Sequence, residues 1–194
     1  MNESFITVVS GLPRSGTSLM MQMLAAGGCP LMTDNLRAPD ESNPRGYFEL
    51  EAVKKLRVDQ SWLADARGRA VKIIHALVRE LPADGRFQFR VLLMIRPIDE
   101  VLASQGAMLA RSGKTSADPA VLARIYQTQM DELERWLGTQ KHFRFMRVEH
   151  QRLLGNPSEV AAEINAFLGG SFDTAAMAAA VDPLLYRERR SQPV

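Results

Sequence analysis

Short apolar runs alternate along the chain with longer segments in which apolar residues recur at helical spacing. The runs occupy residues 5–10, 70–75, 89–96 and 143–149. Nearly continuous apolar character in the first and third runs is typical of parallel strands that are buried on both faces. Helical spacing is found in segments 17–26, 50–64, 99–110, 119–137 and 158–168. The alternation predicts βαβ units, and therefore a three-layer α/β fold with a central parallel sheet of four or five strands flanked by helices.

One segment interrupts this alternation. Residues 33–49 are dominated by Pro, Asn, Asp and Gly, which predicts a loop. Loops of this length in a compact domain are usually functional or disordered, and the aromatic pair Tyr47-Phe48 argues against simple disorder. We therefore expect this loop to contribute to a site.

Composition limits the class of protein. A chain of 194 residues with 46% hydrophobic and 24% charged residues predicts one globular domain spanning residues 1–194. A net charge of +2 is too small for nucleic acid to be the main partner, so any anion must be bound locally. The single cysteine, Cys29, excludes an internal disulfide, and the N-terminus resembles neither a signal peptide nor a membrane span. We expect a cytoplasmic protein in which Cys29 has a packing or loop role.

The stretch GLPRSGTS, from Gly11 to Ser18, follows the first strand and opens the first helix. Backbone N–H groups and the helix dipole make such a turn a site for phosphate or sulfate. A nucleotide-triphosphate loop would carry lysine after Gly16, but this one has Thr17, and the basic residue is Arg14. The third strand ends in Arg96, where a metal-binding acid would be useful. The sequence thus predicts an anion neutralised by arginine, with no metal ion.

These residues resemble a known family. GLPRSGTSLMMQML is similar to the 5′-phosphosulfate loop of the PAPS-dependent sulfotransferases, especially their bacterial and tyrosylprotein branches. RPIDEVLAS supplies Arg96 and Ser104, which match the pair that holds the 3′-phosphate in that family. The segment RFMRVEHQRLLGNPSEVAAEINAFLG resembles the family's closing strand and helix. The resemblance implies a P-loop fold, PAPS as co-substrate, and transfer of a sulfuryl group to a hydroxyl or amine acceptor.

The resemblance also implies roles for individual residues. Arg14 would stabilise charge on the transferred group, and either His75 or Glu49 would act as general base. Lys72 would either help to polarise the sulfate or be a solvated lysine of an edge strand. Asp34 and Glu41 are lesser candidates for the base. The nucleotide would be bound by Arg14, Ser15, Gly16, Thr17, Ser18, Arg96 and Ser104.

The chain departs from the family near its end, where a Gly-rich basic stretch usually closes over the 3′-phosphate. Here the tail carries Arg187, Arg189 and Arg190, which either close over that phosphate or form an exposed tail. Two other functions stay open: a P-loop kinase or NTPase with an altered loop, and a non-catalytic nucleotide-binding module. The expected partners are PAPS or its product PAP and an unidentified acceptor, with a homo-oligomer as one way to complete the acceptor pocket.

Overall fold

A four-stranded, all-parallel sheet forms the centre of the molecule in the computed structural model, which describes residues 5–34, 36–40, 43, 45–111, 113 and 117–182. The strands are β1 (Ile6–Gly11), β2 (Ala70–Lys72), β3 (Phe89–Ile95) and β4 (Phe143–Glu149), in the spatial order β2-β1-β3-β4. Because all strands are parallel, their carboxyl ends meet at one edge of the sheet, where open α/β sheets bind their ligands. The predicted α/β class with four strands is confirmed.

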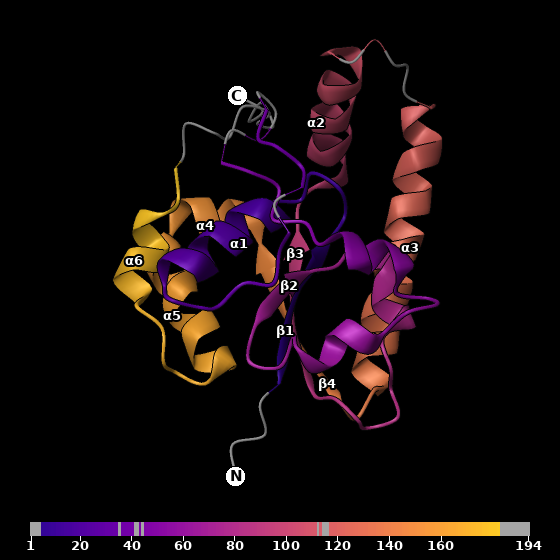
Figure 1. Ribbon diagram of the computed structural model, residues 1–194. Coiled ribbons are helices and arrows are strands. Elements are labelled where there is room, and N and C mark those ends of the chain that lie inside the picture. The colour runs from indigo at the N-terminus through magenta and orange to yellow at the C-terminus, as the bar shows by residue number, and fades with distance from the viewer. Residues whose placement is uncertain are drawn as a thin grey trace.

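Helices cover both faces of the sheet. One layer contains α1 (Thr17–Ala26), α4 (His150–Gly155), α5 (Pro157–Leu168) and α6 (Thr174–Ala179). The opposite side carries α2 (Ile98–Arg111), α3 (Pro119–Thr139) and three short 3-10 helices, η1 (Glu51–Lys55), η2 (Ser61–Ala64) and η3 (His75–Glu80). Figure 1 shows these two groups on either side of the strands, with α2 and α3 extending beyond the sheet. None of the described helices is long and apolar enough to cross a membrane.

Successive residues of each strand face different layers, so the sheet divides the core into two clusters. On β1, Val8 packs with the α3 side, whereas Val9 packs with the α1 side. At the start of β3, the ring of Phe89 stacks on Phe143 with 4.6 Å between centroids, and Trp136 of α3 meets Phe143 edge-on. Burial on both faces explains why β1 and β3 read as nearly continuous apolar runs.

The helix predicted over residues 50–64 is wrong in its extent. The structure has the two 3-10 helices η1 and η2, separated by a turn in which Asp59 accepts hydrogen bonds from both the amide and the hydroxyl of Ser61. Such local side-chain bonds compete with helical hydrogen bonding. The strand predicted over 70–75 ends at Lys72, and η3 begins at His75. The short helices α4 and α6 were not predicted.

Candidate functional site

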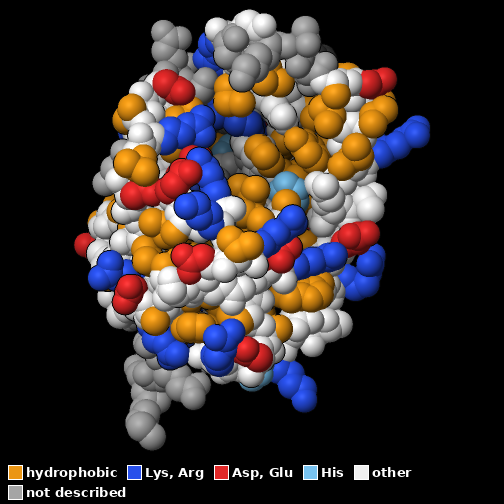
Figure 2. All heavy atoms as spheres, turned by 45° about the vertical axis from the view of Figure 1, so that its right-hand side comes forward, with side chains coloured by type: hydrophobic (Ala, Val, Ile, Leu, Met, Phe, Trp, Pro, Cys, Tyr) orange, Lys and Arg blue, Asp and Glu red, His pale blue; other side chains and the backbone are white. Residues whose placement is uncertain are grey.

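A pocket of about 280 Å³ lies at the carboxyl edge of the sheet. Basic side chains gather on this side of the molecule around a hollow (Figure 2). Among the described residues that line the pocket, five are cationic, namely Arg14, Arg37, Lys72, Arg96 and Arg111. Of the described lining residues, only Glu49 and Asp182 carry a carboxylate. The pocket therefore has a local excess of positive charge in a chain whose net charge is close to zero.

The glycine loop between β1 and α1 forms one wall of this pocket. Gly16, just before α1, has φ 100°, and a Cβ placed there would lie 2.5 Å from Cδ2 of His150. Arg14 adopts the left-handed conformation with φ 69°, which is unusual for a residue with a side chain. The hydroxyl of Ser15 is buried beneath the loop and has no hydrogen-bond partner among the described residues. A strained loop at the start of a helix is suited to an anion. Ser15, which the sequence predicted to bind the nucleotide, is buried and is not among the pocket-lining residues.

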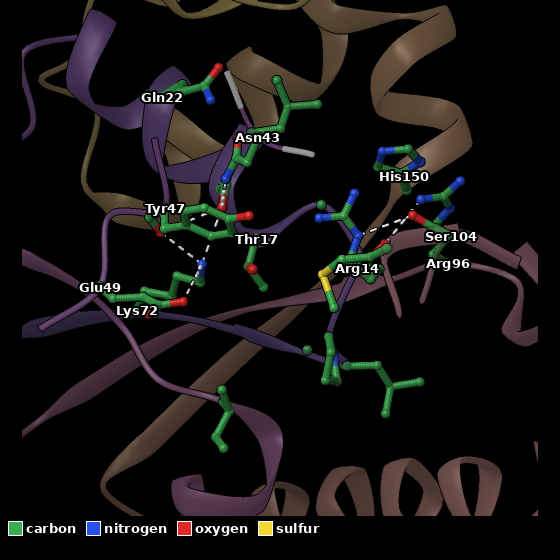
Figure 3. A pocket seen from close by; sticks show the side chains of 18 of the residues that line it. Arg14, Thr17, Gln22, Asn43, Tyr47, Glu49, Lys72, Arg96, Ser104 and His150 are labelled. Atoms are coloured by element: carbon green, nitrogen blue, oxygen red, sulfur yellow. Dashed lines mark hydrogen bonds and ion pairs between the residues drawn. The ribbon is translucent and has the colours of Figure 1, made fainter. Parts of the chain in front are cut away.

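Lys72 brings to this loop the amino group that its sequence lacks. Because Lys72 pairs with Val9 in the β1–β2 register, its side chain can reach the start of α1. The ammonium donates hydrogen bonds to the hydroxyl of Ser18, at 3.1 Å, and to the carbonyl oxygen of Tyr47, at 2.7 Å. Burial lowers the pKa of Lys72 to about 8, although the carboxylate of Glu49 lies 3.9 Å away and opposes this change. A partly desolvated lysine thus stands beside the helix N-terminus (Figure 3).

The predicted loop over residues 33–49 packs against the glycine loop. The side-chain amide of Asn43 donates to the hydroxyl of Ser18 at 2.9 Å. Arg37 lies 3.4 Å from the centroid of the Tyr47 ring and forms an ion pair with Glu49 at 3.0 Å. Asn43 and Arg37 were missed by the sequence reasoning, since no motif marks them within a polar loop. The loop therefore supplies polar groups to the pocket.

The 33–49 loop is also tied to the segment that follows α6. Arg45 donates to the carbonyl oxygen of Ala180 at 2.8 Å and pairs with Asp182 at 2.9 Å. Asp182 itself lines the pocket. Residues from three distant parts of the chain therefore meet at this site.

A second group of basic residues surrounds Ser104 on α2. The Nε atom of Arg14 donates to the Ser104 hydroxyl at 3.0 Å, and Arg96 donates to the backbone oxygen of Arg14 at 3.0 Å. Arg96 also pairs with the buried carboxylate of Glu100 at 2.9 Å, and Gln151 donates to the other oxygen of that carboxylate. Burial lowers the pKa of Arg14, and the nearby charges of other arginines add to the effect. The geometry brings together Arg14, Arg96 and Ser104, as the sequence predicted for nucleotide binding.

The two histidines near the site differ in position. His75 is buried at the start of η3; its Nε2 atom lies 2.9 Å from Oε1 of Gln129, and its ring meets Tyr126 edge-on. It is not among the residues that line the pocket, whereas Glu49 and Lys72 are. His150, which the sequence analysis did not select, does line the pocket, and burial lowers its pKa to about 4, with Arg96 adding to the effect. His150 is therefore neutral at physiological pH.

The other candidates lie elsewhere. The carboxylate of Asp34 accepts hydrogen bonds from the backbone of Leu36 and Glu51 and is not among the pocket-lining residues. Cys29 is buried, and burial raises the pKa of its thiol to about 11, as fits a packing role. Glu41 and the three arginines of the tail lie outside the described residues. Within the described ranges, no group of three His, Cys, Asp or Glu side chains could hold a metal ion.

Comparison with known proteins identifies the fold. No protein-family model matches the sequence, and no curated protein sequence matches it either. The sulfotransferase domain of the Synechococcus PCC 7002 olefin synthase superposes with a TM-score of 0.59 at 18% identity, covering 100% of this chain and 90% of that one. The sulfotransferase domain from the curacin biosynthetic pathway superposes with a TM-score of 0.59 at 13% identity, covering 100% of this chain and 94% of that one. The chain has the sulfotransferase-like P-loop fold.

Proposed function

We propose that this protein transfers a sulfuryl group from PAPS to a hydroxyl or amine acceptor. The proposal depends on the observation that one pocket contains two separate positively charged regions. Lys72 and the glycine loop stand at the start of α1, while Arg14 and Arg96 surround Ser104 on α2. This arrangement suits a ligand with anionic groups at two separate points, as in a nucleotide phosphorylated at both the 5′ and 3′ positions of its ribose.

The reaction would form a bond between the acceptor oxygen or nitrogen and sulfur, and would break the bond between sulfur and the oxygen that bridges it to the 5′-phosphate. Negative charge then grows on the bridging oxygen as PAP leaves, and the acceptor loses a proton. Lys72, which lines the pocket beside the start of α1, would stabilise this charge, whereas the Arg14 side chain lies at Ser104. The backbone N–H groups that precede and open α1, from Gly16 to Ser18, would bind the 5′-phosphate.

Of the two candidate bases, Glu49 fits this reaction better than His75. Glu49 lines the pocket next to Lys72, and its ion pair with Arg37 orients the carboxylate. His75 is directed toward Gln129 and Tyr126 of α3. We therefore propose that Glu49 takes the proton of the acceptor.

Calorimetric titration with PAP and with ATP-Mg tests the donor. We expect tight, magnesium-independent binding of PAP that is weakened in Ser104→Ala. This variant is preferable to Arg96→Ala, because loss of the arginine would remove the ion-pair partner of the buried Glu100. A preference for ATP-Mg would instead support a kinase or NTPase and refute the proposal.

Turnover of labelled PAPS with a panel of hydroxyl and amine acceptors tests catalysis. We expect Glu49→Gln to lower kcat by at least about 100-fold, as for loss of a general base. The matched control is Glu51→Gln, which changes an exposed glutamate of η1 that does not line the pocket. PAP binding without turnover of any acceptor would favour the non-catalytic module, and unchanged turnover in Glu49→Gln would refute its role as base.

A further inference from the structure

One face of helix α2 is directed toward the pocket. Ser104, Met108 and Arg111 all line it, and Glu100 lies one turn before them. These residues are spaced by four, four and three positions, which places them on the same side of a helix. The face therefore extends from the buried Glu100 to Arg111, the last residue of α2.

Arg111 has no assigned role in the site described above. Its Nε atom donates to the carbonyl oxygen of Ala107 within the same helix, at 3.1 Å, so the terminal nitrogens of the guanidinium remain for other partners. No carboxylate among the described residues forms an ion pair with it, and its side chain is exposed at the mouth of the pocket. Its charge is also close enough to act on the guanidinium of Arg14.

Three guanidinium groups thus line the pocket near this face: Arg14 donates to Ser104, Arg96 donates to the backbone oxygen of Arg14, and Arg111 follows Ser104 by seven positions on α2. Glu100 neutralises Arg96 through their buried ion pair. Arg14 and Arg111 add two further guanidinium groups on this side of the pocket. A phosphate monoester carries close to two negative charges at neutral pH, and arginine binds its oxygens in bidentate fashion, so these side chains suit such a group.

On the basis of the proposed function, we propose that Arg111 binds the 3′-phosphate of the nucleotide at Ser104 and selects nucleotides that carry it. The tail arginines that the sequence suggested for closure over this phosphate lie outside the described residues. Arg111, an exposed residue that lines the pocket, provides a cation for the same phosphate from within α2.

Calorimetry with PAP and with adenosine 5′-phosphate, which lacks the 3′-phosphate, tests this inference. We expect Arg111→Ala to weaken PAP binding by about 10- to 100-fold, the usual effect of losing a charge-assisted contact, and to leave the affinity for adenosine 5′-phosphate within about twofold. Arg111→Lys should show an intermediate loss, because it keeps the charge without the planar fork. The matched control is Arg124→Ala on α3, an exposed arginine that does not line the pocket.

The ratio of the two affinities separates this role from a purely structural one. The inference would be overturned, with the proposed function intact, if Arg111→Ala lost affinity equally for both nucleotides. It would also be overturned if the wild-type protein bound PAP tightly and Arg111→Ala bound it just as tightly. If the wild-type protein bound neither nucleotide, both would be overturned. A lower melting temperature in Arg111→Ala with an unchanged affinity ratio would assign Arg111 to the stability of the α2 C-terminus instead.

Discussion

Replacing Lys72 by methionine should make the ligand-free protein more stable at neutral pH while weakening its anion site. At pH 7 the buried ammonium costs the fold about 3 kcal/mol, the free energy that separates a pKa of about 8 from the ordinary 10.5. The variant also loses the hydrogen bonds to Ser18 and Tyr47, which contribute about 1 kcal/mol each. The net gain is about 1 kcal/mol, equivalent to a rise in melting temperature of about 3 °C for a chain of this size.

The pH dependence makes this prediction more specific. Between pH 8 and 10.5 the folded protein has released the proton of Lys72, whereas the unfolded chain still binds it. Stability therefore rises with pH in this window, and the wild-type protein should gain about 2.5 kcal/mol relative to Lys72→Met by pH 10. The variant should be the more stable protein at pH 7 and the less stable one at pH 10.

Urea denaturation of both proteins at the two pH values measures this reversal. Lys54→Met is the matched control, because that lysine of η1 is exposed and no such reversal is expected. A difference in unfolding free energy that is the same at pH 7 and pH 10 would show that Lys72 titrates normally, and would refute the reasoning. Added PAP should stabilise the wild-type protein more than the variant, since only the wild type keeps the cation.

Three further results are expected. Gly16→Ala should destabilise the fold by about 2–4 kcal/mol in thermal denaturation, because its Cβ would collide with His150 at a positive φ. Gly28→Ala, also at positive φ but with open space around it, should cost only about 1 kcal/mol, and equal losses would contradict the collision. Near pH 8.5, PAP binding should take up a proton at Lys72, seen as a binding enthalpy that depends on the buffer; no dependence would exclude this coupling. His75→Ala should leave kcat within about threefold of wild type at temperatures where it stays folded, and a loss of 100-fold would restore His75 as the base.

The sequence predicted best those elements whose residues are buried in the same way along most of their length. The strand predicted over 89–96 is β3, residues 89–95, because burial on both faces makes it apolar from Val91 to Ile95. The segment 50–64 was predicted as one helix because some of its apolar residues have helical spacing. That spacing covers only a short stretch, and the segment forms two short 3-10 helices. The turn at Asp59 and Ser61, a local side-chain effect, divides it.

The site was predictable in part. The glycine loop and the pair Arg96 and Ser104 are local patterns, and the fold brings them together through Arg14. The contact of Lys72 with Ser18 depends instead on the register between β1 and β2, which only the assembled sheet sets. The direction of His75 depends on where β2 ends and η3 begins, and the sequence had predicted one strand over 70–75.

Lys72 and Ser18 lie far apart along the chain, so their contact can be used to measure folding. They are 54 residues apart and become neighbours only when β2 pairs with β1. A bound anion is therefore a reporter of sheet assembly, since the unfolded chain has no equivalent site. A ligand at 100 times its dissociation constant would add about 2.7 kcal/mol to the free energy of unfolding. For a destabilised variant, titration with this ligand would therefore measure the fraction of protein that is folded.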